Sequence, residues 1–320
     1  MGINIYINGI FIYVILIYII FMYVILLFFP NKGAIMITII CAEGGSSINS
    51  LKKSIEELGE KCEILFLSDD NLQIDQSFNI DSDIIHSRCG IGEYLDKLTL
   101  FSWQILNVLE VENHIFINSL KTIYNSADKF KTIKLLSKNN IETPKTGLIR
   151  DYNDAKLFMS KNNINYPVII KNCFSKCGNG VKLIKNDAEL KEASKNAMWY
   201  GTTIQEYVEF GNNGIYKDIR ILVVDGEVVG GYRRVSSNFI TNLHQGNKVE
   251  LLKINDELSE IALKSAEAID GQIVGVDILP SKEGYKVLET NTAPGTKGFR
   301  ELGINVDKKI AKCLINYKKI

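Results

Sequence analysis

The sequence has few residues suited to several common kinds of functional site. Only three of its 320 residues are histidines, and its six cysteines are scattered without a CxxC pair. A structural zinc site needs clustered cysteine and histidine ligands, so that class of site is not expected. The closest pair, Cys173 and Cys177, lies in a glycine-rich stretch without partner ligands. The cysteines are therefore expected to be reduced thiols of a cytosolic protein.

An excess of charge of either sign is also absent. Acidic and basic residues number 37 each, so the formal net charge is zero. Nucleic-acid binding requires a basic face against the phosphates, and no nucleic-acid partner is expected. The chain shows no repeats and no low-complexity linker, while its 46% hydrophobic content is enough for a substantial core. Its length suggests two domains or one large one.

One long apolar run stands near the start of the chain, at residues 10–29, and contains no charged residue. About 20 such residues can span a bilayer. Lys32, Lys52 and Lys53 follow the run, so the positive-inside tendency predicts a cytosolic main body, with membrane contact only through residues 10–29. In the other interpretation Met36 is the true start, and residues 1–35 are a gene-prediction artefact.

The rest of the chain alternates strands and helices. From Met36, an apolar strand, an amphipathic helix and a second strand predict a small parallel α/β domain over 36–125. A helix over 126–139 opens a second domain, 126–320. There, Asp225-Gly226 predicts a β-hairpin, and residues 272–291 predict another.

The stretch "KVLETNTAPG" ends this second hairpin. Alternation places Glu289 and Asn291 on one face of a strand, and an odd-numbered loop centred on Glu283 would put Asp277 opposite Glu289. Two carboxylates and an amide suit Mg²⁺ carrying a nucleotide better than zinc. The alternative is an ordinary solvated strand end.

Lys171 ends the apolar strand "PVIIK" and precedes a loop that contains Gly178 and Gly180. Glycines let backbone amides approach a phosphate, and a lysine adds a positive charge. The loop is not a Walker loop, because it leads into a strand and lacks Gly-Lys-Ser/Thr. The alternative is a hairpin loop with a solvated lysine.

Residues 205–208 end another strand, and such an extended segment can offer backbone groups and an apolar floor to adenine. Asp218 and Arg220 share one face of the next strand, and Arg233 and Arg234 end its partner. These charges could face a transferred phosphoryl group, or they could form cross-strand ion pairs that contribute little each.

Taken in order, these motifs resemble the ATP-grasp superfamily, and specifically the RimK-like α-L-glutamate ligases. The family's closing pattern is an acid in a "GVD" strand followed by Glu-x-Asn-x-x-Pro-Gly, and here Gly275-Val276-Asp277 precedes Glu289 to Gly295. The resemblance implies an α/β fold with α+β lobes. In it, the parallel α/β domain precedes an ATP-grasp domain with a small lid lobe at about 126–205 and a large lobe at about 206–320.

The resemblance also implies roles for matching residues. The nucleotide-binding positions are Lys129, Lys171, Gly178, Gly180, Gln205, Glu206, Tyr207, Val208, Asp218 and Asn242. The metal ligands are Asp277, Glu289 and Asn291, and the catalytic arginines are Arg220 and Arg233. The family's loop usually reads Arg-Ser-Asn, whereas this chain has Ile240-Thr241-Asn242. That departure changes the contacts expected there.

The implied activity is ATP-dependent ligation of a carboxylate to an amine through an acyl phosphate, with Mg²⁺ or Mn²⁺ and two ions. The amine is expected to be that of glutamate, and the acceptor a coenzyme tail or a peptide carboxylate such as a protein C-terminus, with a coenzyme tail favoured. Lys297, Arg300 and Arg234 are candidates for binding acidic groups. A homo-oligomer is expected. The competing hypothesis is a non-catalytic, membrane-tethered nucleotide-binding module.

Overall fold

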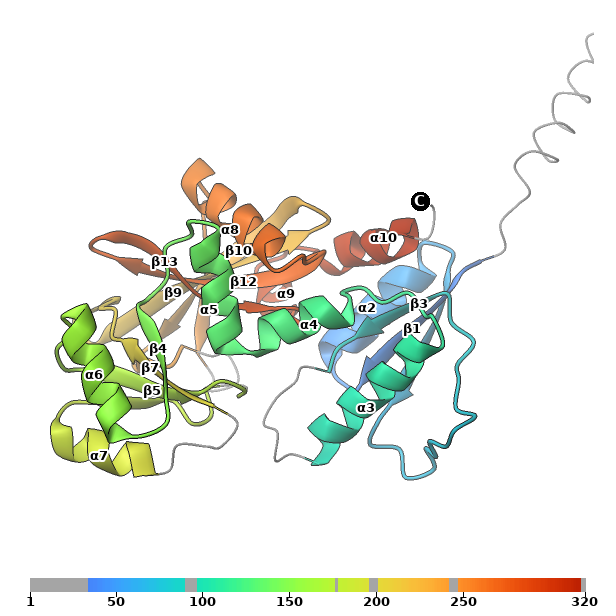
Figure 1. Cartoon of the computed structure of the whole chain (residues 1–320). Coiled ribbons are helices and arrows are strands. Elements are labelled where there is room, and N and C mark those ends of the chain that lie inside the picture. The colour runs from blue at the N-terminus through green and yellow to red at the C-terminus, as the bar shows by residue number, and fades with distance from the viewer. Residues whose placement is uncertain (1–33, 90–96, 176–177, 196–200, 242–246, 318–320) are drawn as a thin grey trace, which may run out of the picture. The chain divides into compact units, whose positions relative to one another are not determined.

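The computed structural model describes residues 34–89, 97–175, 178–195, 201–241 and 247–317 (Figure 1). The chain divides into two units, Met1–Ile35 and Met36–Ile320. The predicted membrane-spanning helix over residues 10–29 lies outside the described residues. No helix in the described ranges is both long and apolar enough to cross a membrane.

The second unit begins with a three-stranded parallel sheet, as the strand–helix–strand pattern predicts. Its strands β1 (Met36–Cys41), β2 (Lys61–Phe66) and β3 (Ile84–Ser87) lie in the order β2-β1-β3. Helix α2 (Ser46–Glu56) follows β1, and α3 (Lys97–Val111) packs Ile105, Leu106 and Leu109 against the sheet. The carboxyl ends of β1 and β3 therefore lie side by side.

The helix predicted over 126–139 is two helices, α4 (Leu120–Ala127) and α5 (Lys129–Lys138). Asp128 between them is extended, and its carboxylate accepts hydrogen bonds from the backbone N–H groups of Phe130 and Lys131. Asp128 thus caps α5 and starts a new helix at Lys129. The predicted domain boundary between residues 125 and 126 falls inside α4, and it stays a prediction.

A four-stranded antiparallel sheet comes next. Its strands β4 (Thr146–Ile149), β5 (Val168–Asn172), β6 (Lys182–Ile184) and β7 (Thr202–Glu206) lie in the order β4-β7-β5-β6. Helices α6 (Tyr152–Asn162) and α7 (Asp187–Lys195) pack on one face of the sheet (Figure 1). Val168, Ile170 and Ile204 face these helices, which by alternation leaves Ile169, Lys171 and Gln205 for the other face.

The largest sheet has six strands. They are β8 (Gly211–Asn212), β9 (Ile215–Val224), β10 (Glu227–Ser236), β11 (Lys248–Leu251), β12 (Ile273–Ser281) and β13 (Gly284–Asn291), in the order β11-β10-β9-β12-β13 with β8 beside β9. Helix α8 (Asp256–Ala268) packs on Ile219, Val276 and Val287, and α9 (Lys297–Glu301) and α10 (Asp307–Tyr317) follow β13. The sheet's opposite face carries charged residues, among them Arg220, Arg234 and Asp277.

Both predicted hairpins are present in this sheet. Asp225 and Gly226 have positive φ angles of 53° and 72° and join β9 to β10 in a two-residue turn. In the second hairpin Asp277 pairs with Glu289 as predicted, but the loop is not odd-numbered. Ser281 pairs with Gly284, and a bulge beyond Asp277 leaves Leu288 as the extra residue. The extra residue lies in the strand instead of the turn.

Candidate active site

A cavity of about 960 Å³ lies among the three sheets. Most of the residues expected to bind nucleotide or metal, or to act in catalysis, line it, namely Lys129, Lys171, Gly178, Gln205, Glu206, Tyr207, Val208, Asp218, Arg220, Asp277, Glu289 and Asn291. Gly180 and Arg233 do not line it. Asn242 lies outside the described residues. The fold therefore brings together residues as far apart in sequence as Lys129 and Asn291 around one cavity.

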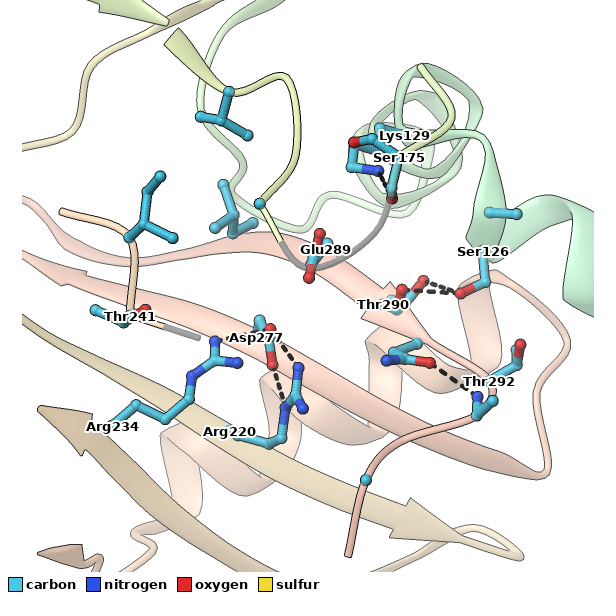
Figure 2. Close-up of a pocket in the computed structure, with 18 of the residues that line it drawn as sticks. Ser126, Lys129, Ser175, Arg220, Arg234, Thr241, Asp277, Glu289, Thr290 and Thr292 are labelled. Carbon is cyan, nitrogen blue, oxygen red and sulfur yellow. Dashed lines mark hydrogen bonds and ion pairs between the residues drawn. The ribbon is translucent and has the colours of Figure 1, made fainter. Parts of the chain in front are cut away.

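Strand register places four polar side chains in a row across the large sheet. Tyr232 pairs with Arg220, Arg220 with Asp277, and Asp277 with Glu289. Arg220 donates two hydrogen bonds of 2.7 Å to Asp277, from Nε to Oδ1 and from Nη2 to Oδ2 (Figure 2). This parallel pair of bonds is the strongest geometry available to an arginine and a carboxylate.

Arg234 completes the cluster. Its Nε donates to Asp218 Oδ1 at 2.8 Å, and its Nη2 donates to Asp277 Oδ2 at 2.8 Å and also to Asp218 Oδ2. Arg233 was expected at the site, but successive residues of β10 point to opposite faces, and Arg233 is the one that points away. Arg234 occupies the place expected for Arg233.

The buried charges of this cluster balance. Burial alone would raise the pKa of Asp277, but the guanidinium groups of Arg220 and Arg234 hold it below its usual range. Asp277 is therefore ionised at neutral pH, and two carboxylates offset two guanidinium groups. The cluster joins side chains of three strands, β9, β10 and β12, but adds little net charge to the cavity.

Two lysines bring positive charge into the cavity. Lys171 is 4% exposed and donates to Gln205 Oε1 at 3.1 Å, while Lys129 donates to the carbonyl oxygen of Ser175 at 2.6 Å, tying α5 to the glycine loop. Burial and the charge of Lys129 lower the pKa of Lys171 to about 8, against a smaller opposing effect of Glu289. Within the described ranges neither lysine has a carboxylate in ion-pair contact, so an anionic ligand suits the cavity.

Glu289 is a free carboxylate in the site. In the described part of the chain its oxygens accept no hydrogen bond, and Figure 2 places it between the strand of Asp277 and the Lys129–Ser175 pair. Asn291 Oδ1 accepts one bond, from the backbone N–H of Ala293 at 2.8 Å, and Asp277 Oδ1 accepts one from Arg220. The carboxylate of Glu289, Asn291 Oδ1 and Asp277 Oδ1 each keep at least one lone pair for another partner.

This oxygen set fits a hard divalent cation. Mg²⁺ is usually held by one or two carboxylates, with phosphate and water supplying other ligands. The described residues contain no group of three or more His, Cys, Asp or Glu side chains arranged to hold a metal. An ion at this site would thus rely on the amide of Asn291 and on phosphate oxygens besides the carboxylates.

Residues 205–208 offer a nucleotide base mainly their backbone. Gln205 is held by Lys171 and by Thr146, whose Oγ1 accepts from Nε2 at 2.7 Å. The carboxylate of Glu206 accepts from Lys286 at 2.9 Å. Val208 is buried. Both polar side chains are therefore committed to protein contacts, which supports the expected role of this segment as a backbone edge with an apolar neighbour.

The first sheet supplies residues that the sequence analysis did not assign. Ser46 and Ser47 line the same cavity from the first turn of α2, and Arg88 lines it from the loop that follows β3. A signal for them exists, because ligands of open parallel sheets bind beyond the carboxyl ends of the strands.

The structure gives no sign that a described cysteine acts as a nucleophile. The five described cysteines are free and buried, and burial raises their pKa values to about 11 or 12.

Comparison with known proteins agrees with this geometry. The family model of the RimK-like ATP-grasp domain matches residues 126–314. The chain belongs to the RimK-like ATP-grasp family. The expected family and enzyme class, an ATP-dependent ligase, are thereby confirmed, and so is the ATP-grasp fold with its mixed α/β content.

Two curated relatives of this RimK-like chain carry the name coenzyme gamma-F420-2:alpha-L-glutamate ligase. That of Methanococcus maripaludis is 66% identical over 284 residues, 89% of this chain and 100% of the relative. That of Methanocaldococcus jannaschii is 57% identical and covers 89% of this chain and 99% of the relative. A solved structure of the ATP-grasp ligase PsnB with a phosphomimetic variant of a minimal precursor, Mg and ADP has a TM-score of 0.67 at 16% identity, covering 88% of this chain and 98% of that chain.

Proposed function

We propose that this protein is a glutamate ligase that uses ATP and Mg²⁺ to join the amine of L-glutamate to a carboxylate of coenzyme γ-F420-2. The observation that carries the proposal is the 66% identity to the Methanococcus maripaludis ligase over the whole of that relative. The cavity supports it, because it combines two uncompensated lysines with the free carboxylate of Glu289.

The reaction needs an activated acceptor, since a carboxylate is a poor electrophile. The acceptor carboxylate attacks the γ-phosphate of ATP, ADP leaves, and an acyl phosphate forms. The amine of glutamate then attacks the acyl carbon and inorganic phosphate leaves. Lys129 and Lys171 face the phosphates and stabilise the charge that moves between oxygens, and the buried Arg220–Asp277–Arg234 cluster holds the supporting strands in register.

Glu289, Asn291 and Asp277 would hold the divalent ion. When bound, the ion offsets negative charge on the ATP phosphates. Glu289 is the best single residue for testing this role, because it takes part in no hydrogen bond of the described structure, whereas Asp277 also holds two arginines. The use of Mn²⁺ and the presence of a second ion stay predictions.

The test is a coupled assay of ADP release with Mg²⁺, ATP, L-glutamate and coenzyme γ-F420-2, together with mass spectrometry of the coenzyme. The wild-type protein is expected to release ADP and add a glutamyl residue. Glu289→Gln is expected to lower kcat at least 100-fold while its melting temperature stays within about 2 °C of wild type. Wild-type turnover by Glu289→Gln would contradict the metal assignment.

The competing hypothesis of a non-catalytic nucleotide-binding module is not favoured by the family match and the relatives. It makes a distinct prediction in the same assay. Tight ATP binding without ADP release, across the coenzyme and a panel of peptide acceptors, would support the module and contradict the ligase.

A further inference from the structure

Arg88 is a cation whose charge the ATP site does not use. Its guanidinium group has five N–H donors, and one of them, on Nη2, donates to the carbonyl oxygen of Pro294 at 2.8 Å. No described carboxylate lies in ion-pair contact with it. Arg234, on the same cavity, is held by two aspartates. The two arginines therefore differ: in the described part of the chain, Arg88 keeps N–H donors without a partner and has no carboxylate in ion-pair contact.

Arg88 is half-buried, and this partial burial makes the arrangement costly for the protein alone. Burial lowers the pKa of Arg88, and Asp307 offsets only part of that effect. Asp307 itself is already committed, because its Oδ2 accepts from Arg300 at 3.0 Å and from Ser50 at 2.7 Å. An arginine remains charged at neutral pH. A half-buried positive charge with free donors is stabilised when an anion binds beside it.

The topology of the first sheet places Arg88 where ligands of such sheets bind. The strand order is β2-β1-β3, so the chain leaves β1 toward one side and returns with β3 on the other. The crevice between the carboxyl ends of β1 and β3 is thus a switch point, and Arg88 directly follows β3. The loop after β1, which ends at Gly45 and leads into α2, forms the other side of this crevice.

Two serines at the start of α2 have hydroxyl protons to donate. Ser46 Oγ accepts from Arg300 Nη2 at 3.0 Å, and Ser47 Oγ accepts from the backbone N–H of Thr296 at 3.2 Å. With their oxygens already accepting, both hydroxyl groups are left with a proton to donate, and both residues line the cavity. The N-cap of α2 is Gly45 without a side-chain cap, so the first-turn N–H groups add to the positive potential.

We infer that Arg88, Ser46 and Ser47 form a subsite that binds a carboxylate which is not activated in the reaction. The inference rests on the proposed glutamate-ligase function and names a part of the same cavity. Arg88 contacts Pro294, five residues after Glu289, so the subsite lies on the continuation of the strand that carries the free carboxylate. The bound carboxylate comes from one of two sources, the incoming L-glutamate or the glutamyl tail of the acceptor.

Steady-state kinetics of Arg88→Gln identify the source. If the carboxylate belongs to L-glutamate, the KM for glutamate rises about tenfold or more and the KM for the coenzyme does not change; if it belongs to the acceptor, the reverse holds. The dissociation constant for ATP, measured separately by calorimetry, stays within about twofold of wild type. Arg88→Lys keeps the charge without the planar fork, and an intermediate KM is expected.

The matched control is Arg150→Gln. The side chain of Arg150 is 87% exposed. It forms an ion pair with Asp154 on the surface, and no role in the cavity is proposed for it. All kinetic constants of this variant should equal those of wild type. If Arg88→Gln does not fold, Ser46→Ala at the exposed start of α2 takes its place, with a smaller rise of the same KM expected.

Three results would overturn the subsite. One is an unchanged KM for both substrates in a folded Arg88→Gln protein. Another is a loss of ATP affinity without a change in either substrate KM, which would assign Arg88 to the nucleotide. If the wild-type protein has no ligase activity, the proposed function fails separately. Direct calorimetric titration of wild type and Arg88→Gln with L-glutamate and with coenzyme γ-F420-2 then decides the subsite, and equal or absent binding in both proteins overturns it.

Discussion

Asp277 has a structural function and a proposed function in metal binding, which the sequence motif does not separate. It is 1% exposed, and its carboxylate joins Arg220 and Arg234, while its Oδ1 accepts a single hydrogen bond in the described structure. Removing one partner from a buried ion cluster is more damaging than never having built the cluster, because the remaining charges stay buried. A substitution at Asp277 therefore tests the fold as well as the chemistry.

Asp277→Asn is expected to lower the free energy of unfolding by about 3–5 kcal/mol, since Arg220 would lose the carboxylate that it pairs with and Arg234 would keep only Asp218. Urea denaturation measures this loss. Glu289→Gln is the matched comparison, because it removes a neighbouring carboxylate that holds no arginine. Equal stability of Asp277→Asn and wild type would show that Asp277 does not support the cluster.

Lys171 gives the site a pH dependence. Its pKa is lowered to about 8 in the folded protein, whereas a lysine in an unfolded chain has a pKa of about 10.4. Between these values the unfolded chain binds more protons, so this group's effect on stability becomes more favourable as pH rises from about 8 toward 10.4. The same loss of charge weakens attraction to phosphate. The Kd for ATP should therefore rise about tenfold from pH 7 to pH 9.

Calorimetric titration of ATP across that pH range, with Lys171→Met alongside, checks this expectation. The variant should bind more weakly at pH 7 and show a smaller change with pH. An identical pH dependence in the two proteins would assign the titration to another group.

Among the elements, the β12–β13 hairpin and the loop after it decide where the oxygen ligands lie. Gly275 in β12 approaches Pro294 so closely that an added Cβ would lie 2.9 Å from Pro294 Cβ. Pro294 also accepts the hydrogen bond from Arg88, so this contact joins the hairpin, the loop and the first sheet. A proline ring cannot rotate away, and the loop itself would have to move.

Gly275→Ala should therefore lower stability by about 1–3 kcal/mol and reduce ligase activity. Gly295→Ala is the control for stability, because an added Cβ there meets nothing within 4 Å. Thermal unfolding of both variants separates close packing from a general effect of alanine in this loop. Equal melting temperatures for the two variants would contradict the proposed steric role of Gly275.

At the scale of the whole molecule, Asn118 joins the first sheet region to the large sheet. Its Nδ2 donates to the carbonyl oxygens of Ile273 at 2.7 Å and Thr292 at 3.2 Å, and its Oδ1 accepts from the N–H groups of Gln272 and Ile273. The residue is 2% exposed. One buried amide thus satisfies four backbone groups on β12 and the site loop, which helps to make residues 36–320 one compact unit.

Asn118→Ala should lower the free energy of unfolding by roughly 2–5 kcal/mol, because these backbone groups lose their partner in a buried place. Asn139→Ala removes an exposed asparagine that bonds only within its own helix end, and a change below about 0.5 kcal/mol is expected. Denaturant titration compares the two. A loss at Asn118 no larger than that at Asn139 would mean that the bridge contributes little.

Much of the fold could be predicted because its signals are local. The Asp225-Gly226 turn, the strand alternation around Asp277 and the parallel start of the chain each follow from a few neighbouring residues. The division of residues 126–139 into two helices could not, because it depends on a single backbone angle at Asp128. The predicted odd-numbered loop of the second hairpin was wrong for a similar reason, since a bulge can place the extra residue in a strand instead of the loop.

The sequence by itself determined the family and the residue types available to the site, because motif spacing and the alternation of side chains along strands are properties of the chain alone. Only the tertiary structure decided that Arg234 instead of Arg233 joins Asp277, that Glu289 stays free, and that Arg88 reaches the same cavity. Those outcomes depend on which strands are neighbours and which faces are covered, and contacts through space settle both.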